Sequence, residues 1–334
     1  MTSSAIPPQI DLAFLNPLIE EVGIQKAIPA ISKNANLIKK IEAITRLVQT
    51  EHKLVLGDAR DLSSIDDESV HLIVTSPPYW SLKKYHESDG QLGNIQDYEA
   101  FLPELDKVWA ECYRILAKGG RLIVVVGDVC LSRKEAGRHL VMPLHASIIE
   151  SCRRIGFDNL SPIIWHKIAN ATFEVSNGGG GILGKPFEPN GVIKNDIEFI
   201  LMQRKPGAYR KPDTEKRLLS TISQENHKLW FRQIWTDIPG ASTQDHPAPY
   251  PVELSTRLIR MFSFVGDTVL DPFVGTGTTM LSAAATGRNS IGIEIDPRYL
   301  EYAYQRLRKQ GIMIETPQTV KKYQQTLSGD FPYR

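Results

Sequence analysis

The chain is poor in cysteine and has no long apolar segment. Its three cysteines, Cys112, Cys130 and Cys152, form no CxxC pair and are odd in number, which argues against a disulfide framework and against a zinc site. The longest apolar run, Leu122–Val126, has the length of a strand and is too short to cross a membrane. The first ten residues lack the basic and apolar regions of a signal peptide. We therefore expect a cytoplasmic protein that binds no metal.

The chain also lacks an excess of charge of one sign. Its 39 basic and 38 acidic residues leave a formal net charge of +1, so any binding to nucleic acid must depend on local basic groups. The apolar fraction of 42% suffices for a packed core and argues against disorder. A length of 334 residues allows one large α/β domain with an insertion, or two domains.

From residue 52 onward, short apolar runs alternate with segments of helical periodicity. This alternation predicts a mostly parallel sheet that is covered by helices on both faces. We expect strands at residues 53–56, 70–75, 121–126, 161–165, 197–202, 268–270 and 290–295. We expect helices at residues 36–48, 101–116, 140–155, 252–264, 278–285 and 299–309.

The pattern divides the chain into five parts. We expect a helical N-terminal extension over 1–50, one half of the sheet domain over 51–168, an irregular region rich in glycine and proline over 169–244, the other half over 245–310, and a tail over 311–334. The strand at 53–56 supplies the position beside the strand at 291–295, so the sheet is predicted to be circularly permuted. Permutation is physically reasonable where chain termini lie close together at the surface.

A glycine-bearing turn follows the strand at 268–270, in the segment Asp271-Pro-Phe-Val-Gly-Thr-Gly-Thr-Thr279. Gly275 and Gly277 allow the backbone to approach a ligand at the carboxyl end of the sheet, and Thr278 begins a helix. About twenty residues later the next strand ends at Glu294, whose carboxylate is placed to accept the hydroxyl protons of a ribose. The turn lacks the third glycine of a dinucleotide site. Asp296, before a proline, is expected to cap the following helix.

A rigid proline turn follows the strand at 70–75, in the segment Ser76-Pro77-Pro78-Tyr79-Trp80. Proline fixes φ and donates no hydrogen bond, so the hydroxyl of Ser76 and the carbonyl of Pro77 are held in place as acceptors. The ring of Tyr79 offers a face on which a planar group stacks, and Trp80 extends that wall.

Together the two motifs resemble those of the amino-group DNA methyltransferases, and their order, with the catalytic motif first, resembles the permuted beta class. The resemblance covers about residues 52–168 and 245–310. It implies a circularly permuted methyltransferase fold with an inserted target-recognition region at 169–244, S-adenosylmethionine as cofactor, and duplex DNA as partner. The implied catalytic residues are Ser76, Pro77, Pro78 and Tyr79, and the implied cofactor residues are Asp58, Asp271, Phe273, Gly275, Gly277, Thr278 and Glu294.

The roles of these residues follow from the chemistry of the family. An exocyclic amino nitrogen is a poor nucleophile because its lone pair is delocalised into the ring. Two hydrogen-bond acceptors, Ser76 Oγ and the carbonyl of Pro77, would draw the nitrogen toward tetrahedral geometry and make the lone pair available. The base must leave the duplex to be reached. Asp58, which ends the strand beside Glu294, would face the adenine amino group of the cofactor; it reads equally well as an acid in a turn. Serine at the head of the motif is typical of the cytosine-N4 members.

Two alternatives remain open at this stage. Adenine-N6 methylation is the nearest, because both bases present a similar amino group. A non-catalytic nucleic-acid-binding module on the same scaffold is an alternative of another class. Cytosine-C5 methylation is excluded, because it uses a cysteine next to a proline and none of the three cysteines follows one. A restriction endonuclease of the same system is a further expected partner.

The basic residues expected to bind DNA lie mainly in the irregular region. They are Arg204, Lys205, Arg210 and Lys211, with Tyr209 among them, and Lys167 after an earlier strand. Such a segment fits contact with phosphates and an aromatic probe. A solvated loop is the alternative. Trp80 of the proline turn is a further expected contact with DNA.

Overall fold

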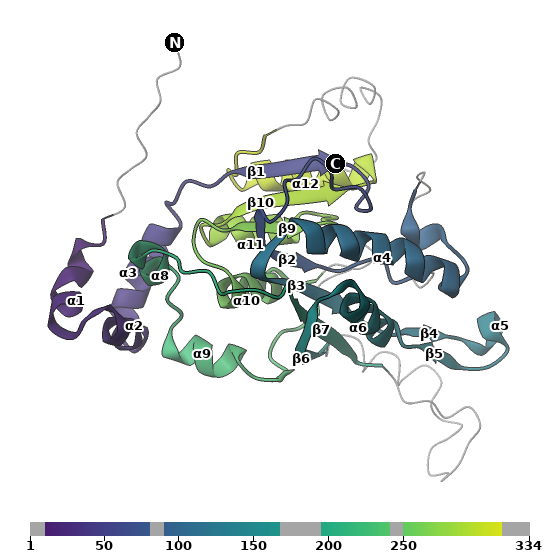
Figure 1. The fold of residues 1–334 in the computed structure, drawn as a ribbon, viewed down its shortest axis with the longest axis horizontal. Helices are drawn as coiled ribbons and strands as arrows, with labels where there is room; N and C mark the ends of the chain where they lie inside the picture. Colours follow the sequence, from purple (N-terminus) through teal and green to yellow (C-terminus); the bar gives the residue numbers. More distant parts are fainter. Residues whose placement is uncertain (1–10, 81–89, 168–194, 241–249, 316–334) are drawn as a thin grey trace, which may run out of the picture.

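The structure, a computed structural model, describes residues 11–80, 90–167, 195–240 and 250–315. Its centre is an eight-stranded sheet with the strand order β1-β10-β9-β2-β3-β7-β6-β8 (Figure 1). The strands are β1 (His52–Leu56), β2 (Val70–Thr75), β3 (Leu116–Val126), β6 (Asp158–His166), β7 (Ile197–Arg204), β8 (Ile234–Trp235), β9 (Thr268–Asp271) and β10 (Asn289–Glu294). All neighbours are parallel except β7, which runs antiparallel to β3 and β6.

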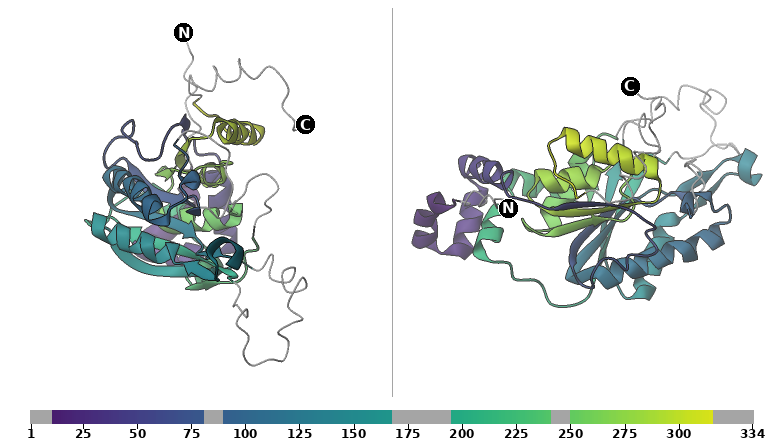
Figure 2. Two further views of the ribbon diagram at one scale, coloured as in Figure 1. Left: turned by 90° about the vertical axis from the view of Figure 1, so that its right-hand side faces the viewer. Right: turned by 90° about the horizontal axis from the view of Figure 1, so that it is seen from above.

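The central strands are apolar throughout because helices cover both faces of the sheet. Leu122, Val124 and Val126 of β3 pack on the side of α4 (Tyr98–Ile115) and α6 (Leu144–Ile155). Ile123 and Val125 pack on the other side, with α10 (Val252–Phe262) and α11 (Thr278–Ala285). The helix α12 (Pro297–Lys309) packs with α11 beside β1 (Figure 2). This is the predicted doubly wound α/β fold.

The predicted permutation is confirmed by the pairing of β1 with β10. The two strands are parallel and in register from His52 with Ser290 to Leu56 with Glu294, although more than two hundred residues separate them in the chain. The chain therefore runs from β9 to β10 and then, in space, to β1. On the other side of β9 lie β2 and β3, so the strand order reverses between β9 and β2. Such a switch point is where open α/β sheets bind ligands.

The N-terminal helices form a small unit of their own at the amino ends of the strands. Here α1 (Asn16–Val22), α2 (Ile24–Ser32) and α3 (Ala35–Thr45) pack against α8 (Thr214–Leu219), at the left of Figure 1. Leu15, Ile31, Ile41 and Leu218 are buried between them. This position is far from the carboxyl ends of the strands, where the motifs lie.

The structure differs from the predicted elements in two places. The helix expected at 140–155 begins only at Leu144, because residues 140–142 form β5 (Leu140–Met142), which pairs with β4 (Val129–Leu131), and α5 (Arg133–Ala136) joins the two. The irregular region contains α8, α9 (Gln224–Trp230) and β8 in addition to β7, the strand that was predicted at 197–202. Because β7 lies between β3 and β6, part of this region completes the sheet. No helix of the described ranges is long and apolar enough to cross a membrane.

Candidate active site

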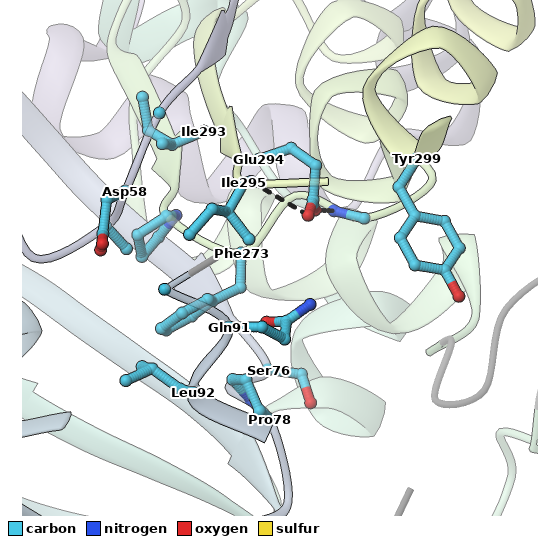
Figure 3. Close-up of a pocket in the computed structure, with 15 residues that line it drawn as sticks. Asp58, Ser76, Pro78, Gln91, Leu92, Phe273, Ile293, Glu294, Ile295 and Tyr299 are labelled. Atoms are coloured by element: carbon cyan, nitrogen blue, oxygen red, sulfur yellow. Dashed lines mark hydrogen bonds between the residues drawn. The ribbon is translucent and has the colours of Figure 1, made fainter. Parts of the chain in front are cut away.

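A pocket opens where four neighbouring strands end, at the switch point of the sheet (Figure 3). In the view of Figure 3, Asp58 lies on one side of the pocket, Glu294 on another and Ser76 below, with Phe273 between them. Residues that are distant in sequence thus meet here: Asp58 follows β1, Glu294 ends β10, Phe273 and Gly275 follow β9, and Ser76 and Pro78 follow β2. Six of the predicted site residues share this one pocket.

Glu294 is buried and held by backbone groups. Its Oε2 accepts a hydrogen bond from Gly275 N at 2.9 Å, and its Oε1 accepts from Ile295 N at 3.1 Å and Asp296 N at 3.0 Å. Burial raises the pKa of the Glu294 carboxyl to about 7, against the effect of these donors. The carboxylate keeps acceptor capacity on Oε2 toward the pocket, as a ribose ligand requires. Asp296 caps α12 through Arg298 N, as predicted.

Asp58 is fixed by an arginine that sequence reasoning missed. Arg60 Nη2 lies 2.6 Å from Asp58 Oδ2, and Arg60 Nε lies 3.0 Å from Oδ1. Burial by itself would raise the pKa of Asp58, but the hydrogen bonds from Arg60 outweigh it and lower the pKa. Arg60 also pairs with Glu104 at 2.6 Å and donates to the carbonyl of Gly90, which lines the pocket. Asp58 is therefore held as an oriented carboxylate.

The two glycines of the turn have different neighbours. Gly275, with φ of 51°, lines the pocket. Gly277, with φ of 81°, faces α12, where a Cβ would lie 3.3 Å from Ala303 Cβ. Thr278 is buried, and its hydroxyl accepts a hydrogen bond from Arg306. The structure thus places Gly277 and Thr278 behind the turn, where they shape it, and outside the pocket wall.

Asp271 is also behind the turn, fully buried in a network of hydroxyl groups. Its carboxylate accepts hydrogen bonds from Thr75 Oγ1 at 2.7 Å, Tyr250 OH at 3.0 Å and Thr279 Oγ1 at 2.5 Å, and from Phe273 N at 3.1 Å. Burial raises its pKa. Because Thr75 precedes Ser76, this carboxylate ties the proline turn after β2 to the glycine turn after β9. Asp271 does not line the pocket, although the sequence suggested a cofactor ligand.

The proline turn presents Ser76 and Pro78 to the pocket and buries its aromatic residues. Ser76 Oγ donates to Tyr79 OH at 3.3 Å, and Tyr79 OH reaches Val125 O at 3.5 Å. Trp80 packs edge-on against Tyr98, with ring centroids 5.2 Å apart, inside the main core. The Trp80 ring is as buried as that of Tyr79 and supports the turn from behind, and its contact with DNA stays a prediction.

A second group of side chains surrounds Gly127, at the end of β3. A Cβ at this glycine would lie 3.7 Å from Tyr79 Cε2 and 3.5 Å from Glu198 Cγ. Glu198 Oε1 binds Lys167 Nζ at 2.8 Å, and Lys167 lies over the ring of Trp165. Lys167 is thus linked through Glu198 to the surroundings of Gly127 and the proline turn. Glu198 was missed, because an acid inside an apolar strand gives no distinctive pattern.

The other four predicted DNA contacts lie at the opposite ends of the strands from the pocket. We call this side, where the parallel strands begin, the amino edge of the sheet. Because β7 is antiparallel to β3, its end at Arg204 pairs with Arg121, the first residue of β3 in the ladder between the two strands. Arg204 binds Asp158 at 2.7 Å, Lys205 approaches Glu68 at 3.4 Å, and Arg210 forms a bidentate pair with Asp267. Lys211, which is exposed, follows at the same edge. The structure does not bring these four residues to the pocket, and three of them serve internal ion pairs.

The comparisons with known proteins agree with this geometry. Residues 70–305 match the model of a DNA methylase family of N6 and N4 methyltransferases. The type II methyltransferase M.MjaI of Methanocaldococcus jannaschii is 40% identical over 279 residues, covering 75% of this chain and 88% of that protein. The DNA adenine methyltransferase YhdJ of Escherichia coli is 29% identical over 276 residues, covering 79% and 85%.

A solved structure shares both the sequence and the fold. TTHA0409 of Thermus thermophilus, a putative DNA modification methylase in complex with S-adenosyl-L-methionine, is 53% identical with a TM-score of 0.65. The alignment covers 78% of this chain and 94% of that one. No group of three or more metal-binding side chains occurs among the residues described here.

Proposed function

This chain belongs to the DNA methylase family of N6 and N4 methyltransferases, with S-adenosylmethionine as methyl donor, and we propose that it methylates the N4 amino group of cytosine in duplex DNA. One observation carries the proposal. Ser76, which heads the proline turn, lines the same pocket as Glu294 and Gly275. A methyl donor bound between the two acids would thus lie beside the groups that receive the amino nitrogen.

The residues of this chain would hold the cofactor from two ends. We assign Glu294 to the ribose hydroxyls, through the acceptor capacity of Oε2, and Asp58 to the adenine amino group, in the orientation that Arg60 imposes. Phe273 and Gly275 would contact it from the turn. Asp271, Gly277 and Thr278 would act indirectly, by keeping the turn in shape. Bound there, S-adenosylmethionine supplies a methyl group on a positively charged sulfur, which is open to attack.

The proline turn would prepare the amino group for attack. Ser76 Oγ and the carbonyl of Pro77 would accept its two hydrogens, which draws the nitrogen toward tetrahedral geometry and frees its lone pair. The nitrogen loses a proton to solvent as it gains the methyl group. The base would be extruded from the duplex and stacked on Tyr79, and Lys167 would contact it or the adjacent backbone from the far side of Gly127.

Adenine-N6 methylation is the second candidate, favoured by the similarity to the E. coli adenine methyltransferase. Serine at position 76 favours cytosine. Incubation of unmodified DNA with isotope-labelled cofactor, followed by mass analysis of nucleosides, tests both. We expect N4-methylcytosine. N6-methyladenine would overturn the choice of base, and 5-methylcytosine would overturn the mechanism.

A non-catalytic binding module is the alternative of another class. It predicts no methylated product together with intact binding of DNA, and calorimetry with S-adenosylhomocysteine in the same preparation separates loss of the cofactor site from loss of chemistry. We further propose that the enzyme acts in the cytoplasm beside a restriction endonuclease, as the similarity to a type II methyltransferase suggests. Digestion of DNA from cells that overproduce the protein, with a panel of restriction endonucleases, would show which cleavage it blocks.

A further inference from the structure

A short hairpin follows the end of β3, immediately after the residues that border the proline turn. Its strands β4 and β5 pair antiparallel from Val129 with Met142 to Leu131 with Leu140. Figure 1 shows it extending away from the sheet, with α5 at its far end. The hairpin begins two residues after Gly127, so its base lies beside the site to which a flipped base would be brought.

The tip of the hairpin is ordered by local hydrogen bonds. Ser132 and Glu135 form a capping box at the start of α5: Glu135 Oε2 accepts from Ser132 N at 2.9 Å and from Ser132 Oγ at 2.7 Å. Gly137, with φ of 72°, ends the helix in the left-handed conformation. Glu135 is the only acid between residues 129 and 142. Its carboxylate bonds to Ser132, so within the hairpin it is not paired with a cation of the tip.

Three cations of this tip, Arg133, Lys134 and Arg138, are exposed, and none forms a salt bridge with another residue that the structure describes. The arginines at the amino edge differ, because Arg204 and Arg210 are each matched to an acid. Exposed cations that lie close together repel one another, and binding of a partner with many negative charges relieves this repulsion. The ordered β4–β5 hairpin carries such cations, on the side of the sheet where the pocket opens.

We propose that the β4–β5 hairpin binds the sugar–phosphate backbone of the duplex that flanks the extruded base, through Arg133, Lys134 and Arg138. A two-stranded ribbon has the width to follow the major groove, whose walls carry the phosphates. The inference rests on the DNA substrate of the proposed function and is independent of which base is methylated. The hairpin, in place of the basic residues at the amino edge, would then make the main electrostatic contact with DNA.

Salt dependence of binding to an arbitrary duplex tests this proposal, because contacts to phosphates do not require the recognition sequence. The test variant is R133Q/K134Q/R138Q. The matched control is K33Q/K39Q/K211Q, which removes three exposed lysines from the N-terminal helices and the amino edge. Fluorescence anisotropy with a labelled duplex gives log Kd against log salt, and calorimetry with S-adenosylhomocysteine checks the pocket in each protein.

Each phosphate contact contributes a slope of about 0.9, so loss of three contacts lowers the slope by about 2.7. The ratio of the Kd of the test variant to the Kd of the unaltered protein then falls about fortyfold between 50 and 200 mM salt. The control should keep the original slope, and all three proteins should bind S-adenosylhomocysteine alike. An unchanged slope in the test variant would overturn the proposal, and so would an equal decrease in the control, since that would show an effect of net charge alone.

A native cysteine gives a second measurement without any substitution. Cys130 lies on β4 and is exposed, whereas Cys112 and Cys152 are buried. Alkylation by iodoacetamide should therefore report on the hairpin, and a saturating duplex should slow it while S-adenosylhomocysteine alone should not. Equal rates with and without duplex would contradict contact between DNA and the hairpin, even if methyl transfer is observed.

Discussion

The side of the sheet where the parallel strands end, its carboxyl edge, differs from the amino edge in whether its charged groups are paired with one another. At the carboxyl edge, Asp58, Glu294 and Ser76 converge on one pocket, and the hairpin beside it carries cations without ionic partners among the described residues. At the amino edge, Arg204 and Arg210 are held by Asp158 and Asp267, beneath the N-terminal helices. A cluster of basic residues in a sequence therefore does not identify a binding surface. Arg204, Lys205 and Arg210 at the amino edge are each paired with an acid, whereas the cations of the hairpin have no such partner among the described residues.

The largest effect should come from a serine at the carboxyl edge. Ser76→Ala removes one acceptor from the amino nitrogen, and we expect turnover to fall about 100- to 1000-fold, as for loss of one positioned hydrogen-bonding group in other enzymes. Binding of S-adenosylhomocysteine should be retained. Ser69→Ala, just before the same strand β2, is the matched control, because the Ser69 hydroxyl donates to Asp66 O in its own turn. Equal activity of the two variants would contradict the assignment.

Glu294→Gln should have the next largest effect. Loss of a charge-assisted hydrogen bond of about 1.5–3 kcal/mol weakens cofactor binding about 10- to 150-fold. Because burial raises the pKa of Glu294 to about 7, the unaltered protein must lose this proton to bind well, so affinity should increase as the pH rises from 6 to 8, with proton release. The variant should lack this dependence. Calorimetry in buffers of different ionisation enthalpy measures both.

The same pKa has the opposite effect on the cofactor-free protein. A carboxyl whose pKa is higher in the folded state stabilises that state at low pH, so the contribution of Glu294 is complete below about pH 4.5 and is lost as the pH rises through about 7. Thermal unfolding of the unaltered protein and Glu294→Gln, with and without S-adenosylhomocysteine, should show this reversal. A parallel pH dependence in the two proteins would exclude Glu294 as its source.

At the amino edge, substitution should affect stability and leave DNA binding unchanged. Arg210→Ala leaves Asp267 buried without its partner, and we expect a loss of about 1–2 kcal/mol in the free energy of unfolding, reduced from the value for a fully buried pair because Arg210 is partly exposed. Lys211→Ala, its exposed neighbour, should cost almost nothing. A lower salt slope for Arg210→Ala would return this edge to the DNA surface.

The smallest effect concerns the glycine turn. Gly277 and Gly311 both have left-handed φ values, 81° and 75°, but a Cβ at Gly277 meets Ala303 at 3.3 Å whereas nothing lies within 4 Å of one at Gly311. Gly311→Ala should therefore cost about 1 kcal/mol from the backbone alone, and Gly277→Ala somewhat more. Denaturant unfolding measures the difference. If Gly277→Ala weakened cofactor binding with no loss of stability, this glycine would belong to the pocket wall.

The sequence predicted the features that depend on local pattern. The apolar strands, the glycine turn and the proline turn each have a signature within a few residues, and the permuted order follows from the order of these motifs along the chain. Ser76, Gly275 and Glu294 follow from their positions at strand ends. The fold class follows from the alternation of strands and helices.

Features that depend on contacts between distant residues could not be predicted in this way. Asp271 is held by Thr75 and Tyr250, and only the folded structure shows that these hydroxyls use its carboxylate. The direction of β7 placed Arg204 at the edge away from the pocket, and an apolar strand gives no sign of its direction. The burial of Trp80 depends on its packing against Tyr98, which the proline motif alone does not show.

Hydrogen–deuterium exchange tests the difference between the two edges most directly. S-adenosylhomocysteine should slow exchange at residues 57–59, 272–275 and 293–295, which surround the pocket, and a duplex should slow it further at residues 129–142. Residues 204–219 and the helices α1–α3 should exchange at the same rate in all three states. Protection by DNA at residues 204–219, with none at 129–142, would contradict the account.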